Sequence, residues 1–339
     1  MNRHRVEEIA NAVLYEGYLL YPYRASAVKN RQRWNFGILY PRAFAEAQKG
    51  ADRWNTQTEC LVKPLAPDAG LHITARFLHL IERNDGWQEA AERNVAIREL
   101  RLSAIASHPV RHTFAFPANR ESDARFVRTR EAIEGAIDVQ SEHLANGSFK
   151  IRVEVSNTAV VETAKSSSRE RVLMQSLASA HTILEVESAE FISLLDPPAE
   201  YREAAAACQN LGTYPVLAGD EGQRNVMLSS PIILYDYPQI AAESAGALFD
   251  GTEIDEILTL RIITLSDEEK LEMARGDERA RQILERTEAM PPEQLMKMHG
   301  ALRSLRPTAE STCRSMETIF SFITSLFTAI RRVCGPSDT

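Results

Sequence analysis

The sequence is poor in glycine, has few cysteines and contains no long apolar run. Only 15 of its 339 residues are glycine, below the usual ~7%, which excludes collagen-like and glycine-loop-rich architectures. The four cysteines are widely spaced and form no C-x-x-C pair, so reduced thiols are expected. The longest uncharged apolar stretch, 318–330, is shorter than the ~20 residues of a membrane span. Since the first ten residues also lack the apolar run of a secretory signal, we expect a soluble cytoplasmic protein.

Motifs that dictate a reaction are also missing. The chain has no phosphate-binding G-x-x-x-x-G-K-[ST] loop, no G-x-G-x-x-G, no G-x-S-x-G elbow and no H-E-x-x-H pair. Pro109 prevents a helix that would join His108 and His112 at ligand spacing. Ser179 and His181 lie two residues apart on a predicted helix, where they cannot face each other. The sequence therefore predicts no cofactor and favours a non-catalytic role, while enzymatic activity stays open.

Hydrophobic periodicity predicts an α+β fold, with a central antiparallel, β-sandwich-like sheet and a helix-rich C-terminal half. Residues 5–16 have the period of an amphipathic helix that stops at Gly17. The predicted sheet spans about residues 65–160, where apolar and polar residues alternate in short segments separated by turns. Its strands are expected at 71–77, 110–116, 133–139 and 149–155, with a hairpin turn at 146–148.

The later residues have mostly helical periods. Leu173, Leu177, Ala180 and Leu184 form one apolar stripe behind a Ser167–Glu170 capping pair, which predicts a helix. Further helices are expected at 196–212, from the Ser266–Glu269 capping box to 288, and at 291–305; strands are expected at 227–235 and 258–263. The organisation predicted is an aromatic/basic segment (1–60), a β-rich domain (61–163), an α+β part packing on it (164–305) and a C-terminal helical tail (306–339).

Residues 15–44 combine aromatic and basic side chains. They hold eight of the 24 aromatic residues, and five cations with no acid between Glu16 and Glu46, in a chain of net charge −8. Such a segment suits a buried core whose arginines pair with distant acids, a protein interface, or a groove for single-stranded nucleic acid. The overall acidity argues against nucleic acid. Our partner-binding candidates are Tyr15, Tyr21, Tyr23, Arg24, Lys29, Arg31, Arg33, Trp34 and Tyr40.

An acidic stretch at 225–260 is the second unusual feature. It contains six carboxylates and neither Lys nor Arg. Asp250, Glu253 and Asp255 are weak candidate ligands for a divalent cation, which would make the protein a hydrolase. A solvated turn is the structural alternative, and docking of this stretch against the basic one is a third.

The C-terminal residues 317–333 have apolar side chains at helical spacing, followed by Arg331 and Arg332. A helix that docks on the body or on another subunit fits this pattern better than a peripheral membrane helix, because little basic charge lies along its length. A protein partner is therefore expected, rather than a membrane or a nucleic acid.

Three runs resemble a family of bacterial accessory proteins encoded beside actinobacterial-type uptake [NiFe]-hydrogenases. The runs are LYEGYLLYPYRASAVKNRQRWNFGILYP (14–41), SPIILYDYPQIAAESAGALFDGTEIDEILTLRIITLSDEEK (230–270) and ARQILERTEAM (280–290). The resemblance covers about residues 5–305, and the tail after Arg306 is not part of it. It implies an accessory role in assembling or supporting the hydrogenase, with hydrogenase subunits or maturation factors as partners, and it assigns no catalytic residue.

Overall fold

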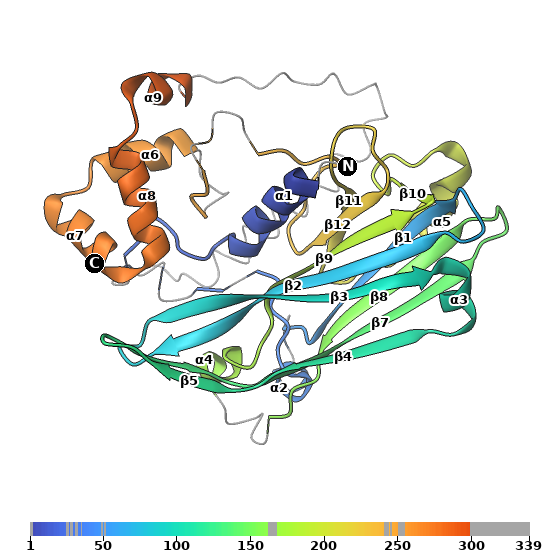
Figure 1. Ribbon diagram of the computed structural model, residues 1–339, viewed down its shortest axis with the longest axis horizontal. Helices are drawn as coiled ribbons and strands as arrows, with labels where there is room; N and C mark the ends of the chain where they lie inside the picture. The colour runs from blue at the N-terminus through green and yellow to red at the C-terminus, as the bar shows by residue number, and fades with distance from the viewer. Residues whose placement is uncertain are drawn as a thin grey trace, which may run out of the picture. The chain divides into compact units, whose positions relative to one another are not determined.

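Two antiparallel β-sheets form the centre of the fold (Figure 1). The computed structural model describes residues 3–24, 27, 30, 33–34, 36–48, 50, 52–161, 168–240, 244, 246–249 and 255–298. All of them belong to one compact unit, Met1–His299. The predicted helical tail at 306–339 lies outside the described residues.

The first sheet has five strands in the order β10-β1-β8-β7-β4. The strands predicted at 110–116, 133–139 and 149–155 are confirmed, and the alternation over 149–155 corresponds to alternating buried and half-buried side chains. A turn at Asn146–Ser148 joins β7 to β8, as expected. The bounds are β1 (Asn55–Pro64), β4 (Val110–Phe116), β7 (Ile133–His143), β8 (Phe149–Asn157) and β10 (Ala189–Ile192).

The second sheet has seven strands. Six follow the order β11-β12-β9-β2-β6-β5, and β3 pairs with β2. The strand predicted at 71–77 is the first half of β2. The bounds are β2 (Gly70–Arg83), β3 (Gln88–Arg101), β5 (Asn119–Ser122), β6 (Val127–Arg130), β9 (Ala178–Glu187), β11 (Tyr214–Leu217) and β12 (Val226–Ser230).

The largest apolar cluster lies between the two sheets and contains side chains of both. Phe77 of β2 stacks on Phe114 of β4, with ring centroids 5.6 Å apart. Opposite Phe114, β7 carries Gly135, where a Cβ atom would lie 2.2 Å from the Phe114 ring. The close approach of this ring therefore requires glycine at position 135.

Helices surround the sheets, and the α+β prediction with helices in the C-terminal half is confirmed. The helix α1 buries Val6, Ile9 and Val13 against the seven-stranded sheet, as its period predicts, and Gly17 after it has φ +71°. No helix in the described part of the chain is long and apolar enough to cross a bilayer. The bounds are α1 (Arg3–Tyr15), α2 (Arg42–Ala47), α3 (Leu102–Ser107), α4 (Arg169–Leu173), η2 (Ala199–Tyr201), α5 (Arg202–Ala206), α6 (Asp255–Ile263), α7 (Asp267–Gly276), α8 (Glu278–Glu288) and α9 (Pro292–Met298).

Several secondary-structure predictions differ from the structure. The expected helix through Leu184 is the short α4 followed by strand β9; the Ser168 side chain accepts the capping bond from Arg171 N–H, and the predicted capping residue Ser167 lies outside the described residues. The expected strand at 258–263 belongs to helix α6. The predicted helix from the Ser266 capping box to 288 is two helices, α7 and α8, because Asp277 is extended and caps α8.

Candidate functional site

The aromatic side chains predicted as partner anchors lie almost entirely inside the protein. None of Tyr15, Tyr23, Trp34 and Tyr40 is more than 6% exposed, and Tyr21 is half-buried. They join a second apolar cluster with side chains of α6, α7 and α8. The core interpretation of these rings is therefore confirmed, and in this conformation the buried rings cannot stack on nucleic-acid bases or on a partner.

Arg33 is buried in an aromatic cage. Its guanidinium carbon lies 4.8, 4.7 and 4.1 Å from the ring centroids of Tyr18, Trp34 and Trp87. It donates hydrogen bonds to the carbonyl oxygens of Tyr18 (2.8 Å) and Gln88 (2.7 Å). Burial lowers the pKa of Arg33, but the acceptors and the rings stabilise its charge. Arg33 thus fastens the N-terminal segment to the start of β3.

Arg24 is half-buried and pairs with Glu269 (3.0 Å) and Glu272 (3.4 Å) at α7. Lys29 and Arg31 lie outside the described residues. Described contacts between the basic and acidic stretches include a hydrogen bond from the Tyr23 hydroxyl to the Leu248 carbonyl oxygen (2.8 Å) and ring contacts of Tyr15 and Tyr18 with Phe249. Arg24 is therefore neutralised by carboxylates at α7, which lies C-terminal to the acidic stretch.

Only one of the three candidate cation ligands can be placed. Asp250 and Glu253 lie outside the described residues, and Asp255 begins α6, where it accepts a hydrogen bond from the Ser244 hydroxyl. Within the described ranges, no three His, Cys, Asp or Glu side chains are arranged to hold a metal ion. The described geometry therefore gives the hydrolase alternative no further support.

Ser179 and His181 lie on strand β9, not on the expected helix. The His181 Nδ1–H donates to the Ser179 carbonyl oxygen (2.9 Å), while the Ser179 hydroxyl donates to the Val13 carbonyl oxygen (3.0 Å). The hydroxyl is thus engaged with the backbone rather than with the imidazole, which is the arrangement of a structural serine and not of a nucleophile. Burial lowers the pKa of His181 to about 4.

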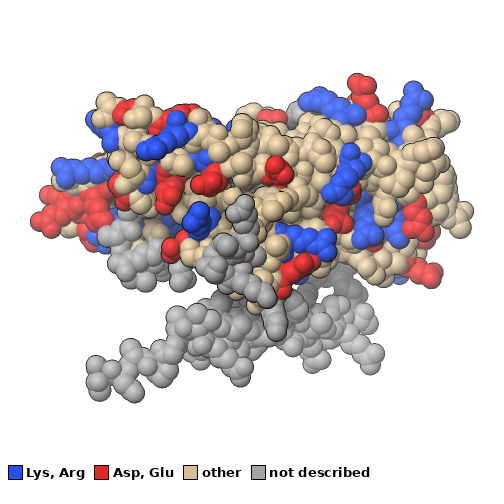
Figure 2. All heavy atoms as spheres, turned by 90° about the horizontal axis from the view of Figure 1, so that it is seen from below, with Lys and Arg blue, Asp and Glu red and all other residues tan. Residues whose placement is uncertain are grey.

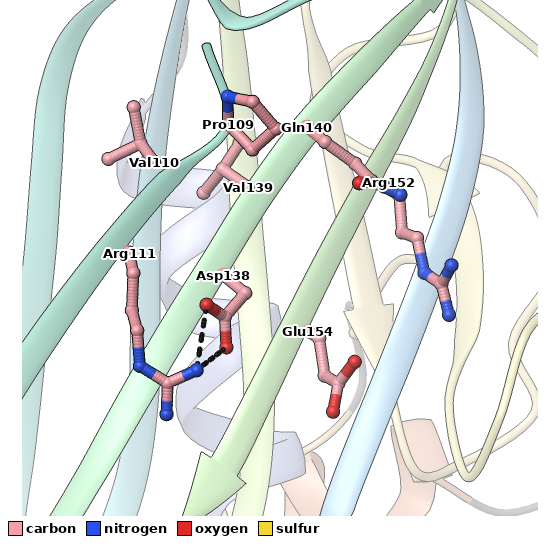
Figure 3. A pocket seen from close by; sticks show the side chains of 8 residues that line it. All are labelled: Pro109, Val110, Arg111, Asp138, Val139, Gln140, Arg152 and Glu154. Carbon is pink, nitrogen blue, oxygen red and sulfur yellow. Dashed lines mark hydrogen bonds and ion pairs between the residues drawn. The ribbon is translucent and has the colours of Figure 1, made fainter.

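The outer face of the five-stranded sheet holds a depression of about 290 Å³ lined by β4, β7 and β8 (Figure 3). Arg111 faces Asp138 across β4 and β7, with nitrogen–oxygen distances of 2.9 and 3.0 Å. Glu154 accepts from Asn55 (2.8 Å), and Arg152 donates to the side chain of a glutamine on β1. Because these polar groups form hydrogen bonds and ion pairs with one another across neighbouring strands, they stabilise the sheet. Few hydrogen-bonding groups on this face therefore remain available to a ligand.

Cationic and acidic side chains alternate over the face drawn in Figure 2, and acidic side chains gather most densely over α7. The described residues on this face do not form the continuous basic surface that a nucleic-acid backbone needs. The described part of this face therefore gives the nucleic-acid alternative no support.

The segment 231–240, which follows β12, holds three exposed large apolar side chains, of which Ile233 and Tyr235 are more exposed than Ile240. Ile233 is 69% exposed and Tyr235 is 86% exposed, whereas the neighbouring Ile232 and Leu234 pack on the cluster beneath α1. The predicted strand at 227–235 ends at Ser230, so this segment is irregular. In the sequence, this segment is marked by the apolar run from Ile232 to Tyr235, which lies between Pro231 and Pro238.

Asp236 fixes this segment. One carboxylate oxygen accepts from the Leu217 N–H of β11 (2.8 Å), and the other accepts from the Ser193 hydroxyl (2.5 Å). The Tyr237 N–H donates to the Leu217 carbonyl oxygen (2.7 Å). The backbone that presents Ile233 and Tyr235 is thus anchored directly after the exposed pair. No protein-family model matches the chain, and no curated protein is significantly similar to it.

Proposed function

We propose that this chain is a non-catalytic accessory protein that binds a partner protein through the segment 231–240. The observation that carries the proposal is the outward placement of Ile233 and Tyr235 on an anchored backbone. Tyrosine and large aliphatic side chains contribute strongly when an interface buries them, and tyrosine is enriched among the residues that dominate binding energy.

The anchoring favours binding. A segment already held by Asp236 loses little conformational entropy when it docks, so most of the free energy of burying the two side chains remains available for affinity. Burying a large apolar side chain is worth about 1.5–3 kcal/mol. A pair of such anchors therefore suits a specific protein contact of moderate strength.

The partner class that we propose is a [NiFe]-hydrogenase subunit or a hydrogenase maturation factor. Two considerations support it: the sequence resemblance extends through 230–270, and this run includes the exposed pair. The proposed role is assembly or support of the hydrogenase.

The test is affinity purification of the tagged full chain from a host that expresses such a hydrogenase, with cross-linking and identification of the hydrogenase proteins by mass spectrometry. The double variant Ile233→Ser, Tyr235→Ser removes the anchors. The matched control Leu65→Ser, Val160→Ser removes two apolar side chains that are 60% and 81% exposed elsewhere. We expect the hydrogenase protein to co-purify with the wild type and the control, and its yield to fall at least about tenfold with the double variant.

Two results would overturn the proposal. One is the absence of any hydrogenase subunit or maturation factor from the wild-type purification. The other is an equal yield from the double variant, whose folding is checked by an unchanged thermal melting temperature.

A further inference from the structure

Three basic side chains lie close together at one end of the space between the sheets. No described acidic side chain forms an ion pair with any of them. His79 lies on β2, Arg93 on β3 and Arg130 at the end of β6. His79 is fully buried, and both arginines are half-buried. The nitrogens His79 Nδ1, Arg93 Nε and Arg130 Nε are all buried and have no hydrogen-bond partner in the described part of the chain.

The strand register explains why these groups share one face. Arg93 is opposite Phe77 and His79 is opposite Ala91, so His79 and Arg93 both point with Phe77 towards the five-stranded sheet. One further step of the β2–β6 register places Arg130 on the same face. Phe116 of β4 closes the group: the Arg93 guanidinium carbon lies 4.6 Å from its ring centroid, and the His79 ring lies 6.4 Å from it.

Another pair of arginines on this face has an acidic partner, unlike Arg93 and Arg130. Arg83 and Arg128 both bind Glu89, at 3.2 and 2.8 Å. For Arg93 and Arg130 the structure gives no ion pair with any described residue. A buried N–H group of an arginine normally has a hydrogen-bond acceptor, because an unpaired buried donor is costly. Burial, and to a smaller extent the nearby Arg130, lower the pKa of Arg93.

The tautomer of His79 adds a second constraint. Nε2 lies 2.8 Å from the Glu131 carbonyl oxygen, and because a carbonyl only accepts, Nε2 carries the proton. Burial together with Arg93 and Arg130 lowers the pKa of His79 to about 4, so the ring is neutral at physiological pH. Its Nδ1 then offers a lone pair, beside two guanidinium groups that only donate.

We propose that His79, Arg93 and Arg130 form a binding site for a small oxyanion that keeps an O–H group, such as hydrogen phosphate or bicarbonate. The two guanidinium groups supply charge-assisted donors to the oxygens of the anion, and the O–H of the anion donates to His79 Nδ1. An oxyanion without a proton, such as sulfate, leaves that lone pair facing an oxygen lone pair. The site therefore distinguishes oxyanions that carry a hydrogen-bond donor from those that do not, and it does not select by charge alone.

The test is calorimetric titration of the full chain with phosphate, bicarbonate and sulfate at slightly alkaline pH, with ¹⁵N spectra of the histidine ring nitrogens. We expect saturable binding of phosphate, bicarbonate or both, little binding of sulfate, and a shift of the His79 Nδ1 resonance. Arg93→Gln or Arg130→Gln should weaken binding at least about tenfold. The control Arg111→Gln removes an exposed cation on the other sheet and should leave binding unchanged.

A variant of His79 separates the two parts of the inference. His79→Phe keeps a ring of similar size and removes the lone pair, so it should reduce the preference for phosphate or bicarbonate over sulfate. The two arginine variants lie at half-buried positions and test the site even if His79→Phe does not fold. Absence of saturable binding of either protonated oxyanion at millimolar concentration, or sulfate binding as tight as theirs, would overturn the proposal.

Discussion

Replacing His181 by asparagine should change how the stability of the protein depends on pH. His181 lies on β9, is 3% exposed and donates from Nδ1 to the Ser179 carbonyl oxygen. The amide nitrogen of an asparagine can make the same hydrogen bond, but it does not bind a proton. The substitution His181→Asn therefore removes the titration of this side chain while it keeps the donor.

The sign and size of the effect follow from linkage. Burial, and to a smaller extent Arg76, lower the folded pKa of His181 from 6.5 to about 4. Between these values the unfolded chain binds more protons than the folded one, so stability is full above about pH 6.5 and is lost as the pH falls towards 4. A pH of about 5 lies about one and a half units below the unfolded pKa. Titration of His181 therefore lowers the free energy of unfolding at this pH by roughly 2 kcal/mol.

The assay is urea unfolding of the wild type and of His181→Asn at about pH 7 and about pH 5. We expect the wild type to lose roughly 2 kcal/mol more than the variant between these two conditions. His79 shifts in the same direction, so the variant keeps part of the slope. Equal losses for both proteins, or an NMR titration of His181 with its midpoint near the unfolded value, would refute the reasoning.

Three further substitutions test the packing by denaturant titration. Ser266→Ala should lower the free energy of unfolding by about 1 kcal/mol, because its hydroxyl accepts from the Glu269 N–H at the start of α7; a change within error contradicts this cap. Gly135→Ala should cost about 1–3 kcal/mol, since the new methyl group meets the Phe114 ring, and an unchanged midpoint would mean that the ring moves freely. Arg33→Lys should cost on the order of 2 kcal/mol, because an ammonium cannot hold both backbone carbonyls and the aromatic cage; a lysine as stable as the arginine would show that only the charge matters.

The strands that could be predicted from the sequence have one covered face. In β8 the apolar residues Ile151 and Val153 point to the core and the charged residues between them point outwards, so the period of two is visible. Strand β9 is covered on both sides: Leu184 packs between the sheets, while Ile183 packs against α1. Nearly all of its residues are buried, polar ones included, so no alternation of period two is visible, and its apolar part alone does not distinguish a strand from a helix. The same ambiguity affects α6, whose core residues Leu258 and Ile262 are one helical turn apart.

The composition of 15–44 identifies an unusual segment but not the direction in which its side chains face. That direction depends on partners far away in sequence. Trp87, which stacks on Arg33, and Asp277, which accepts from the Tyr18 hydroxyl at 2.7 Å, belong to other elements. Neither the pairing nor the burial could be derived from local periodicity, because long-range contacts decide both.

Side chains that stabilise this protein can be distinguished from candidate binding side chains by their partners within the chain. The first have their hydrogen-bonding groups paired, and the second leave a polar group or an apolar surface without a partner. Tyrosines are abundant in the N-terminal segment, yet the Tyr15 hydroxyl binds Glu92 and the Tyr18 hydroxyl binds Asp277, each at 2.7 Å. Groups paired in this way gain nothing from a ligand, since a new contact must first break an existing one. Arg93, with its buried unpaired Nε, and Tyr235, with its ring in water, are in the opposite position. Binding therefore has most to gain at these places, the first suited to an anion and the second to an apolar protein surface.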